Sequence, residues 1–320
     1  MTHNHSVSFS WTLFQETAQT FKSVKTLKKA PNTRHILFVE GQMSDAFLDD
    51  IQAYFEFDHT VKDDLLNPRQ RTKMEFKNSH IFATIHTLYL KEETVKQGYV
   101  SLVLYEDNLM VVDHHRSASL RAIFETLLTE HDVSMDHFFY RLLDTITDHF
   151  LAVFKFCNDE ALSYEETLLE ANHLNQEEFY RVRKNILRLK MIAEPLLDDF
   201  EKMRTLAPHL LKTEHHLYFD DLKDHLIRLL MHVNETREMM RHLLDLNLNN
   251  QSQKMNRIMT TLTLFSAIFI PLSFLTGFFG MNFVHFDVLE YEYALIGFIV
   301  GCAFLAVGMV LLFKKMRWFD

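Results

Sequence analysis

The stretch RIMTTLTLFSAIFIPLSFLTGFFGMNF, residues 257–283, decides the fold of this chain. After Arg257 no formal charge occurs until Asp287, and the segment 258–279 would extend about 33 Å as a helix, enough to cross the roughly 30 Å hydrocarbon core of a bilayer. A second uncharged run, 293–313, follows after a loop too short to hold a domain. We therefore expect a hairpin of two transmembrane helices, with both outer ends on one side of the membrane.

The charges around the two spans predict their orientation. Basic residues flank the outer ends of the hairpin: Lys254, Arg257, Lys314, Lys315 and Arg317. The loop 280–292 carries acidic side chains and no Lys or Arg, so the positive-inside rule places both termini in the cytoplasm. The opening MTHNHSVSFS lacks the basic-then-apolar pattern of a secretion signal, which also favours a cytoplasmic soluble part.

The first span is more polar than lipid requires. Ser and Thr recur along it, and at helical spacing one face carries Asn256, Met259, Leu262, Ser266, Ile270, Ser273 and Gly277. Such a face is suited to lining a pore. Hydroxyl groups in membrane helices also bond to the preceding turn or join helices, and the pattern alone leaves both interpretations open.

A second group of candidate residues is acidic. Asp221 and Asp224 are three positions apart on a predicted helix and share a face, and carboxylate oxygens are the ligands that hard divalent cations prefer. In a chain with a formal net charge of −10, a solvated acidic face is the ordinary alternative. Histidines are abundant, but no His-Glu-x-x-His motif or zinc-site spacing occurs among them.

Several segments together resemble one family. Gly280, Met281 and Asn282 follow the first span, and other matching segments keep the same order and spacing: YFDDLKDHL (218–226), LLDLNLNN (243–250), NRIM (256–259), IFIPLSFLTG (268–277) and FKKMRWF (313–319). They resemble the CorA family of divalent metal-ion transporters, whose first transmembrane helix closes with Gly-Met-Asn. The likeness is strong over residues 218–319 and fainter in RQRTKMEF (69–76) and YVSLVLYEDNLMVV (99–112).

The resemblance implies an architecture and roles for residues. It implies a homopentameric channel in a cell membrane, with Gly280, Met281 and Asn282 as a selectivity mouth that binds hydrated ions. Met259 and Leu262 match hydrophobic constrictions of the pore. Asp221 matches an aspartate that holds a regulatory metal between subunits, and Asp245 matches an acidic position nearer the cytoplasmic end of the pore. The basic residues Lys314, Lys315 and Arg317 would gather as a ring beside that end.

Departures from the family pattern leave more than one divalent metal ion possible as the transported ion. Phe279 stands where tyrosine is usual, Ile270 where Met is frequent, and Val284-His285 replace an acidic residue. We expect magnesium as both the transported and the regulatory ion, because Met281 keeps the motif intact. Cobalt, nickel or zinc transport stays an alternative, as does a membrane-anchored metal sensor or scaffold without flux.

The soluble part is expected to be α+β, followed by a long helix that runs into the hairpin. Strand patterns occur at 7–13, 34–40, 74–76, 81–90, 99–105 and 109–112, and helical ones at 45–57, 120–129, 136–170, 176–206 and 214–279. The expected divisions are an α/β domain 1–116, a helical layer 117–213, a stalk helix 214–257, membrane helices 258–279 and 293–313 around the loop 280–292, and a basic tail 314–320.

Enzyme and nucleotide motifs are missing from the sequence. With seven glycines, none in a Gly-x-x-x-x-Gly-Lys or Gly-x-Ser-x-Gly context, the chain has no phosphate-cradling loop and no nucleophile elbow. We expect no enzymatic activity, no nucleotide cofactor and no nucleic-acid partner. The expected partners are further copies of the chain, the lipid bilayer and divalent cations, which an inside-negative potential would drive inward.

Overall fold

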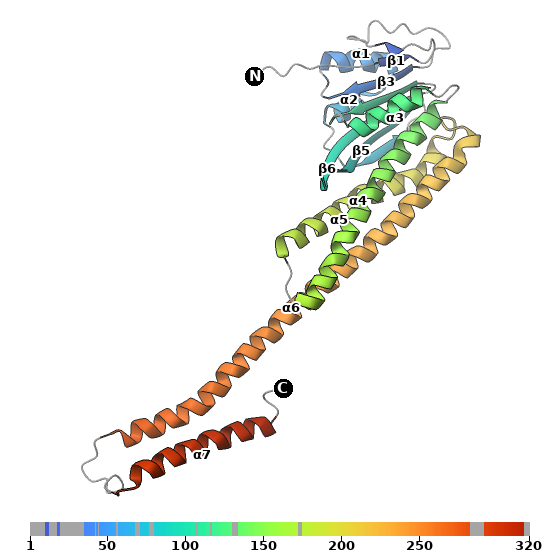
Figure 1. Ribbon diagram of the computed structural model, residues 1–320. Coiled ribbons are helices and arrows are strands. Elements are labelled where there is room, and N and C mark those ends of the chain that lie inside the picture. The colour runs from blue at the N-terminus through green and yellow to red at the C-terminus, as the bar shows by residue number, and fades with distance from the viewer. Residues whose placement is uncertain are drawn as a thin grey trace. The chain divides into compact units, whose positions relative to one another are not determined.

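The computed structural model describes residues 10–12, 18–19, 35–41, 43, 45–55, 57–67, 71–76, 80–105, 108–115, 117–129, 134–171, 175–281 and 291–316. They belong to two compact units, Met1–Leu243 and Leu244–Asp320. The boundary between the units falls inside the longest helix, within the segment expected to be a stalk (Figure 1).

The first unit is built on a mixed seven-stranded sheet. Its strands are β1 (Ser10–Thr12), β2 (Ala18–Gln19), β3 (His35–Glu40), β4 (Lys73–Phe76), β5 (His80–Lys91), β6 (Thr94–Tyr105) and β7 (Asn108–Asp113). The spatial order is β2-β1-β3-β7-β6-β5-β4. β3 and β7 pair in parallel, and the other described neighbours pair antiparallel.

β5 and β6 form the longest hairpin of the sheet. The pairing runs from His80 opposite Tyr105 to Lys91 opposite Thr94. The observed strand begins at Thr94, earlier than the strand expected at 99–105. Its first residues alternate between exposed and half-buried, so this part of the strand extends beyond the core. At the tip, Glu92 and Glu93 adopt φ values of 49° and 55°, the left-handed region that a two-residue hairpin turn of type I′ requires.

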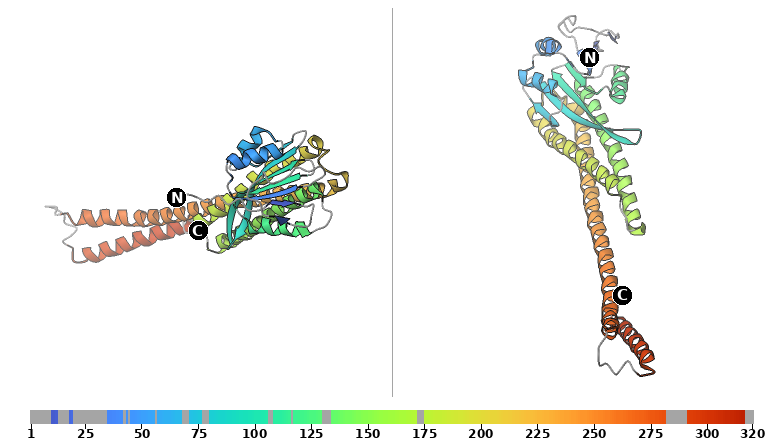
Figure 2. Two further views of the ribbon diagram at one scale, coloured as in Figure 1. Left: turned by 90° about the horizontal axis from the view of Figure 1, so that it is seen from above. Right: turned by 90° about the vertical axis from the view of Figure 1, so that its left-hand side faces the viewer.

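Helices cover both faces of the sheet (Figure 2). Leu37 and Val39 of β3 pack with α1 (Asp45–Phe55) and α2 (His59–Leu66) in one buried cluster. Phe38 points the opposite way, because side chains alternate along a strand, and its ring lies 4.6 Å from Phe124 of α3 (Ala118–Thr129). Phe124 in turn contacts Phe138 of α4 (Met135–Ala171) at 5.6 Å.

Two long helices lie wholly in the first unit, and a third begins there and continues into the second. α4 is followed by α5 (Gln176–Leu206), a 3-10 turn (Thr213–His215) and α6 (His216–Phe279). Contacts between Tyr140 and Phe219, and a hydrogen bond of 2.8 Å from Thr236 to Asn158, join α6 to α4. The expected long helix is confirmed, although it begins two residues later than 214 because the segment before it forms the 3-10 turn. Pro195 lies inside α5 without ending it.

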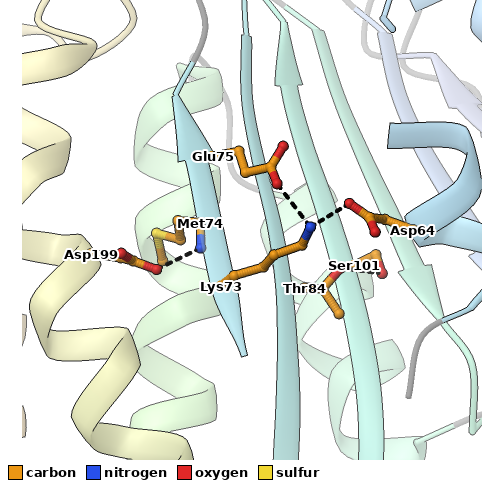
Figure 3. Close-up of polar contacts among 7 residues, drawn as sticks. All are labelled: Asp64, Lys73, Met74, Glu75, Thr84, Ser101 and Asp199. Carbon is orange, nitrogen blue, oxygen red and sulfur yellow. Dashed lines mark hydrogen bonds and ion pairs between the residues drawn. The ribbon is translucent and has the colours of Figure 1, made fainter. Parts of the chain in front are cut away.

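Hydrogen bonds and an ion pair connect the edge strand β4 to helices α2 and α5 (Figure 3). The Lys73 ammonium lies 2.5 Å from Asp64 of α2 and 2.8 Å from Glu75. On the other side the Met74 amide donates to Asp199 of α5 at 2.8 Å. An edge strand leaves one row of backbone groups unpaired, and a side-chain carboxylate at this amide satisfies one of them.

A buried carboxylate links the start of α4 to the turn that precedes α6. Asp136 accepts hydrogen bonds from the Lys212 amide at 2.8 Å and the His215 ring at 2.7 Å, and it is 4% exposed. Burial raises the pKa of Asp136, but hydrogen bonds from Ser134, His215 and the Lys212 amide outweigh it and hold the pKa below its ordinary value. The ionised form therefore stabilises the folded chain.

We predict that Asp136→Asn lowers the melting temperature of the detergent-solubilised protein at pH 7 by roughly 2–12 °C, because it weakens charge-assisted hydrogen bonds. Because the pKa of Asp136 is lower in the folded than in the unfolded chain, its ionised form stabilises the fold at a pH above the unfolded-state pKa of about 4. This stabilisation is lost as the pH falls through the folded-state pKa. The difference between variant and wild type should therefore shrink below about pH 4. Asp159→Asn, at an exposed position on α4, is the control, and an equal effect of both variants at every pH would contradict this role.

Candidate ion pathway and regulatory residues

The second unit contains two helices that are long and apolar enough to cross a membrane. They are the C-terminal part of α6 and α7 (Ala294–Lys315), with mean hydropathies of 2.0 and 2.7 over their most apolar windows. These windows are 6% and 0% buried, unlike the core helix of a soluble protein. Both expected spans are therefore present as helices.

The side of α6 that faces α7 is defined by its less exposed residues. Leu264 is buried, and positions 268, 271, 275 and 279 are half-buried at helical spacing. The Phe279 ring lies 5.1 Å from Phe298 of α7, which identifies the partner of this side. It is the side on which the two helices of one chain meet.

The residues expected to line a pore lie on the opposite side of α6. At 3.6 residues per turn, their line is about half a turn away from the side that carries Leu264 and Phe279. Met259, Leu262 and Ile270 are 59%, 66% and 67% exposed, and Asn256, Ser273 and Gly277 are exposed as well. Ser266 is half-buried. The tertiary structure thus leaves this face uncovered by the described part of the same chain.

The hydroxyl groups of the span divide between two kinds of environment. Thr261, Thr263 and Thr276 donate to backbone carbonyls of the preceding turn at 2.8–3.0 Å, which is the ordinary role of such residues in membrane helices. None of these threonines belongs to the expected pore line. Among the described hydrogen bonds, none involves the side chains of Ser266 and Ser273, which do belong to it.

The end of α6 shapes the expected selectivity mouth. The helix ends at Phe279, and the amides of Gly280 and Met281 bond back to Thr276 and Phe278 at 3.0 and 3.3 Å. A Cβ atom at Gly280 would lie 3.0 Å from the Thr276 carbonyl oxygen, a tight contact that glycine avoids. Met281 is 57% exposed. Asn282, the third residue of the motif, lies outside the described residues.

The basic tail is described in part. Lys314 and Lys315 occupy the last turn of α7, where the helix dipole favours positive charge. Arg317 lies outside the described residues.

The acidic candidates are exposed on α6. Asp221 and Asp224 lie in the first unit, and the His225 ring lies 3.8 Å from the Asp221 carboxylate. Asp245 is also exposed but lies further along α6, in the second unit. Within the described ranges, no group of three or more His, Cys, Asp or Glu side chains is arranged to hold a metal ion.

The structure adds residues to the neighbourhood of Asp221 that the sequence did not indicate. The pKa of Asp144 on α4 is raised by burial, then by the charge of Asp148, and also by the charge of Asp221. Asp144 is thus near enough to Asp221 of α6 to sense its charge. The spacing of Asp221 and His225, one helical turn apart, is visible in the sequence. The proximity of Asp144 depends on the packing of α4 beside α6, and no local pattern encodes it.

Comparison with known proteins identifies relatives along most of the chain. The family model described as CorA-like Mg2+ transporter protein matches residues 38–315. The cobalt/magnesium transport protein CorA of Thermotoga maritima is 26% identical over 275 residues, covering 84% of this chain and 78% of that protein. The zinc transport protein ZntB of Photorhabdus laumondii is 24% identical over 266 residues, covering 81% of this chain and 80% of that protein.

The fold agrees with these relatives. The complete structure of the CorA magnesium transporter from Methanocaldococcus jannaschii superimposes with a TM-score of 0.81 at 15% identity, covering 99% of this chain and 100% of that one. The expected α+β domain, long helix and C-terminal apolar helix are all confirmed. The chain therefore belongs to the CorA family, whose members are membrane transporters of divalent metal ions rather than enzymes.

Proposed function

We propose that the protein is a homopentameric channel of the cell membrane that admits hydrated magnesium ions to the cytoplasm. The observation that carries this proposal is the uncovered face of α6, which is the side away from α7 and includes Met259, Leu262 and Ile270. A single helix cannot enclose a pore. Five copies with this face turned inward would enclose one and place their α7 helices outside.

The driving force in this proposal is the membrane potential. An inside-negative potential is worth about 2.3 kcal/mol per charge per 100 mV, hence about 4.6 kcal/mol for a divalent cation that moves inward. Both termini would lie in the cytoplasm, because Lys254 and Arg257 precede one span and Lys314 and Lys315 end the other. Influx needs no nucleotide under these conditions.

Selection at the mouth would act on the hydrated ion. Magnesium dehydrates reluctantly, so a pore captures it more readily through its bound water molecules than by stripping them. The Asn282 amide oxygen accepts hydrogen bonds from such waters, and backbone carbonyls of Gly280 and Met281 add further acceptors. A ring of five asparagines would recognise the size of the hydration shell.

The ion preference rests on relatives of two kinds. One relative is named for cobalt and magnesium and another for zinc. We favour magnesium because the oxygen acceptors of the Gly-Met-Asn motif suit a hard, hydrated ion, whereas zinc, cobalt and nickel favour imidazole and thiolate ligands, and the expected pore line contains no His or Cys. Transport of zinc or cobalt is the second candidate, and the sequence likeness to the zinc transporter favours it.

Regulation would use the acidic surface of the first unit. Exposed carboxylates such as Asp221 repel one another when brought together and are neutralised when a divalent cation binds between them. Metal bound between neighbouring copies, at Asp221 and Asp224 of one and acidic groups of the next, would favour the packed, closed assembly. Magnesium would thus close its own entry path, with Asp245 acting nearer the pore.

We predict that Asn282→Ala abolishes magnesium influx into proteoliposomes, because it removes the amide that accepts hydrogen bonds from the hydrated ion. Size-exclusion chromatography should show the same oligomer for the variant and the wild type. Near-normal uptake by a correctly assembled variant would refute the proposed role of Asn282.

We predict that Leu262→Gly raises the basal flux at high internal magnesium, because the constriction loses the apolar ring that keeps water out. Leu264→Gly is the matched control: it has the same cost of about 1 kcal/mol in helix propensity but lies on the α7 side. The control should lower stability without a leak. Equal conductance of the two stable variants would count against a gate at Leu262.

We predict that Asp221→Asn weakens inhibition by cytoplasmic magnesium, because it removes a charged ligand while keeping the size of the side chain. Patch recordings with stepped internal magnesium would show a shift of the inhibition curve to higher concentration. Asp198→Asn, at an exposed position on α5, should leave the curve in place. An unchanged curve for Asp221→Asn would mean that this carboxylate is solvated surface.

A further inference from the structure

A small basic cavity lies in the first unit, between the tip of the β5–β6 hairpin and the side of α5. Its volume is 210 Å³. The residues that matter for its chemistry are Thr94 of β6, Phe156 of α4, and Arg181, Lys184, Asn185 and Arg188 of α5. The cavity is separate from the candidate pore residues, which lie in the second unit, and none of the expected regulatory aspartates lines it.

The cations of this cavity come from an unusual segment of the sequence. Residues 181–190, RVRKNILRLK, hold five Arg and Lys residues and no acidic one, in a chain with a net charge of −10. Arg181, Lys184 and Arg188 are spaced by three and four positions, so the helix places them on one face. The remaining faces of the same segment bury Val182, Ile186 and Leu189 in the core.

These cations are only partly neutralised by the protein. Arg181 pairs with Glu160 of α4 at 2.9 Å. Within the part of the chain that the structure describes, no carboxylate lies within 4.0 Å of the Lys184 or Arg188 side-chain nitrogens. Lys184 and Arg188 are one helical turn apart, and like charges at that spacing destabilise a helix. A bound anion would remove this repulsion.

The rest of the lining gives the cavity polar and apolar walls. Asn185 is 7% exposed and hydrogen-bonds to the Cys157 side chain, so its amide is held in place. Phe156 is half-buried and supplies an apolar wall. Glu93, at the hairpin tip, also lines the cavity, and Glu160 pairs with Arg181, which leaves three cations against two carboxylates.

We propose that this cavity binds a small phosphate-bearing anion. Arg188 and Arg181 present planar guanidinium groups that hydrogen-bond two phosphate oxygens at once, Lys184 adds a point charge, and the Asn185 amide and Thr94 hydroxyl are further donors. Pockets for whole drug-sized ligands measure about 300–1,000 Å³, so a cavity of 210 Å³ suits one or two phosphoryl groups rather than a complete nucleotide. The phosphoryl group belongs either to a free anion such as diphosphate or to a lipid headgroup.

The test is calorimetric titration of the full-length protein in nanodiscs of neutral phosphatidylcholine. The buffer is freed of divalent metal, because diphosphate chelates magnesium and would mask binding to the protein. Inorganic diphosphate and glycerol phosphate are the two probes. Tighter binding of diphosphate assigns the site to a free anion, and tighter binding of glycerol phosphate assigns it to a lipid headgroup. Both results support a phosphate site, and both should weaken as salt screens the charges.

Matched variants show whether the binding belongs to this cavity. Lys184→Gln changes an exposed side chain and should weaken binding roughly tenfold, since it removes one charge-assisted contact. Arg188→Gln should do the same. Arg183→Gln removes an exposed positive charge from the same helix outside the cavity and should leave affinity within about twofold. Absence of binding to the wild type, or an equal loss in Arg183→Gln and Lys184→Gln, would overturn the proposal.

Discussion

One continuous helix imposes the main constraint on this protein. α6 contributes to the core of the first unit through Leu222, Leu226 and Val233, which are fully buried. It continues as a segment long and apolar enough to cross a membrane, whose apolar side chains are mostly exposed. A helix satisfies its backbone hydrogen bonds internally in either environment, so the same element can serve in water and in lipid. A break in α6 would expose unpaired backbone groups, and in hydrocarbon such groups are costly.

The two sides of the apolar segment of α6 have different neighbours. One side meets α7 through Phe279, and the side half a turn away carries Met259, Leu262 and Ile270 without a partner from the described chain. The three threonines that bond to their own backbone belong to neither role and need no neighbouring helix. An uncovered face with alternating polar and apolar residues is what a pore built from several copies requires.

Charge is distributed unevenly over the first unit. On α4, burial raises the pKa of Asp144, and the negative charges of Asp148 and of Asp221 on α6 add to this rise. The segment 181–190 of α5 has the opposite character. The first unit thus carries two regions of opposite charge, one rich in carboxylates and one rich in Arg and Lys.

The sequence alone predicts those helices and membrane spans that depend on a pattern within one segment. The two spans follow from their length and lack of charge, and the helices α4, α5 and α6 from long runs of periodic apolar residues, although Pro195 lies inside α5 and Pro271 inside α6. The assignment of one face of α6 to a pore stays a prediction. Even the bounds of α5 agree with the sequence prediction, because glutamates begin it and Pro208 follows it closely. The Gly-Met-Asn motif and the segments that match around it indicate the family without any tertiary contact.

Tertiary structure alone decided how distant segments meet. It paired β3 with β7 in parallel, extended β6 back to Thr94, and placed Asp144 near Asp221. It also brought the hairpin tip to the cations of α5, which creates the basic cavity. Such contacts depend on packing between residues far apart in sequence. The period of one segment reports which face is buried, but it carries no information about which segment buries it.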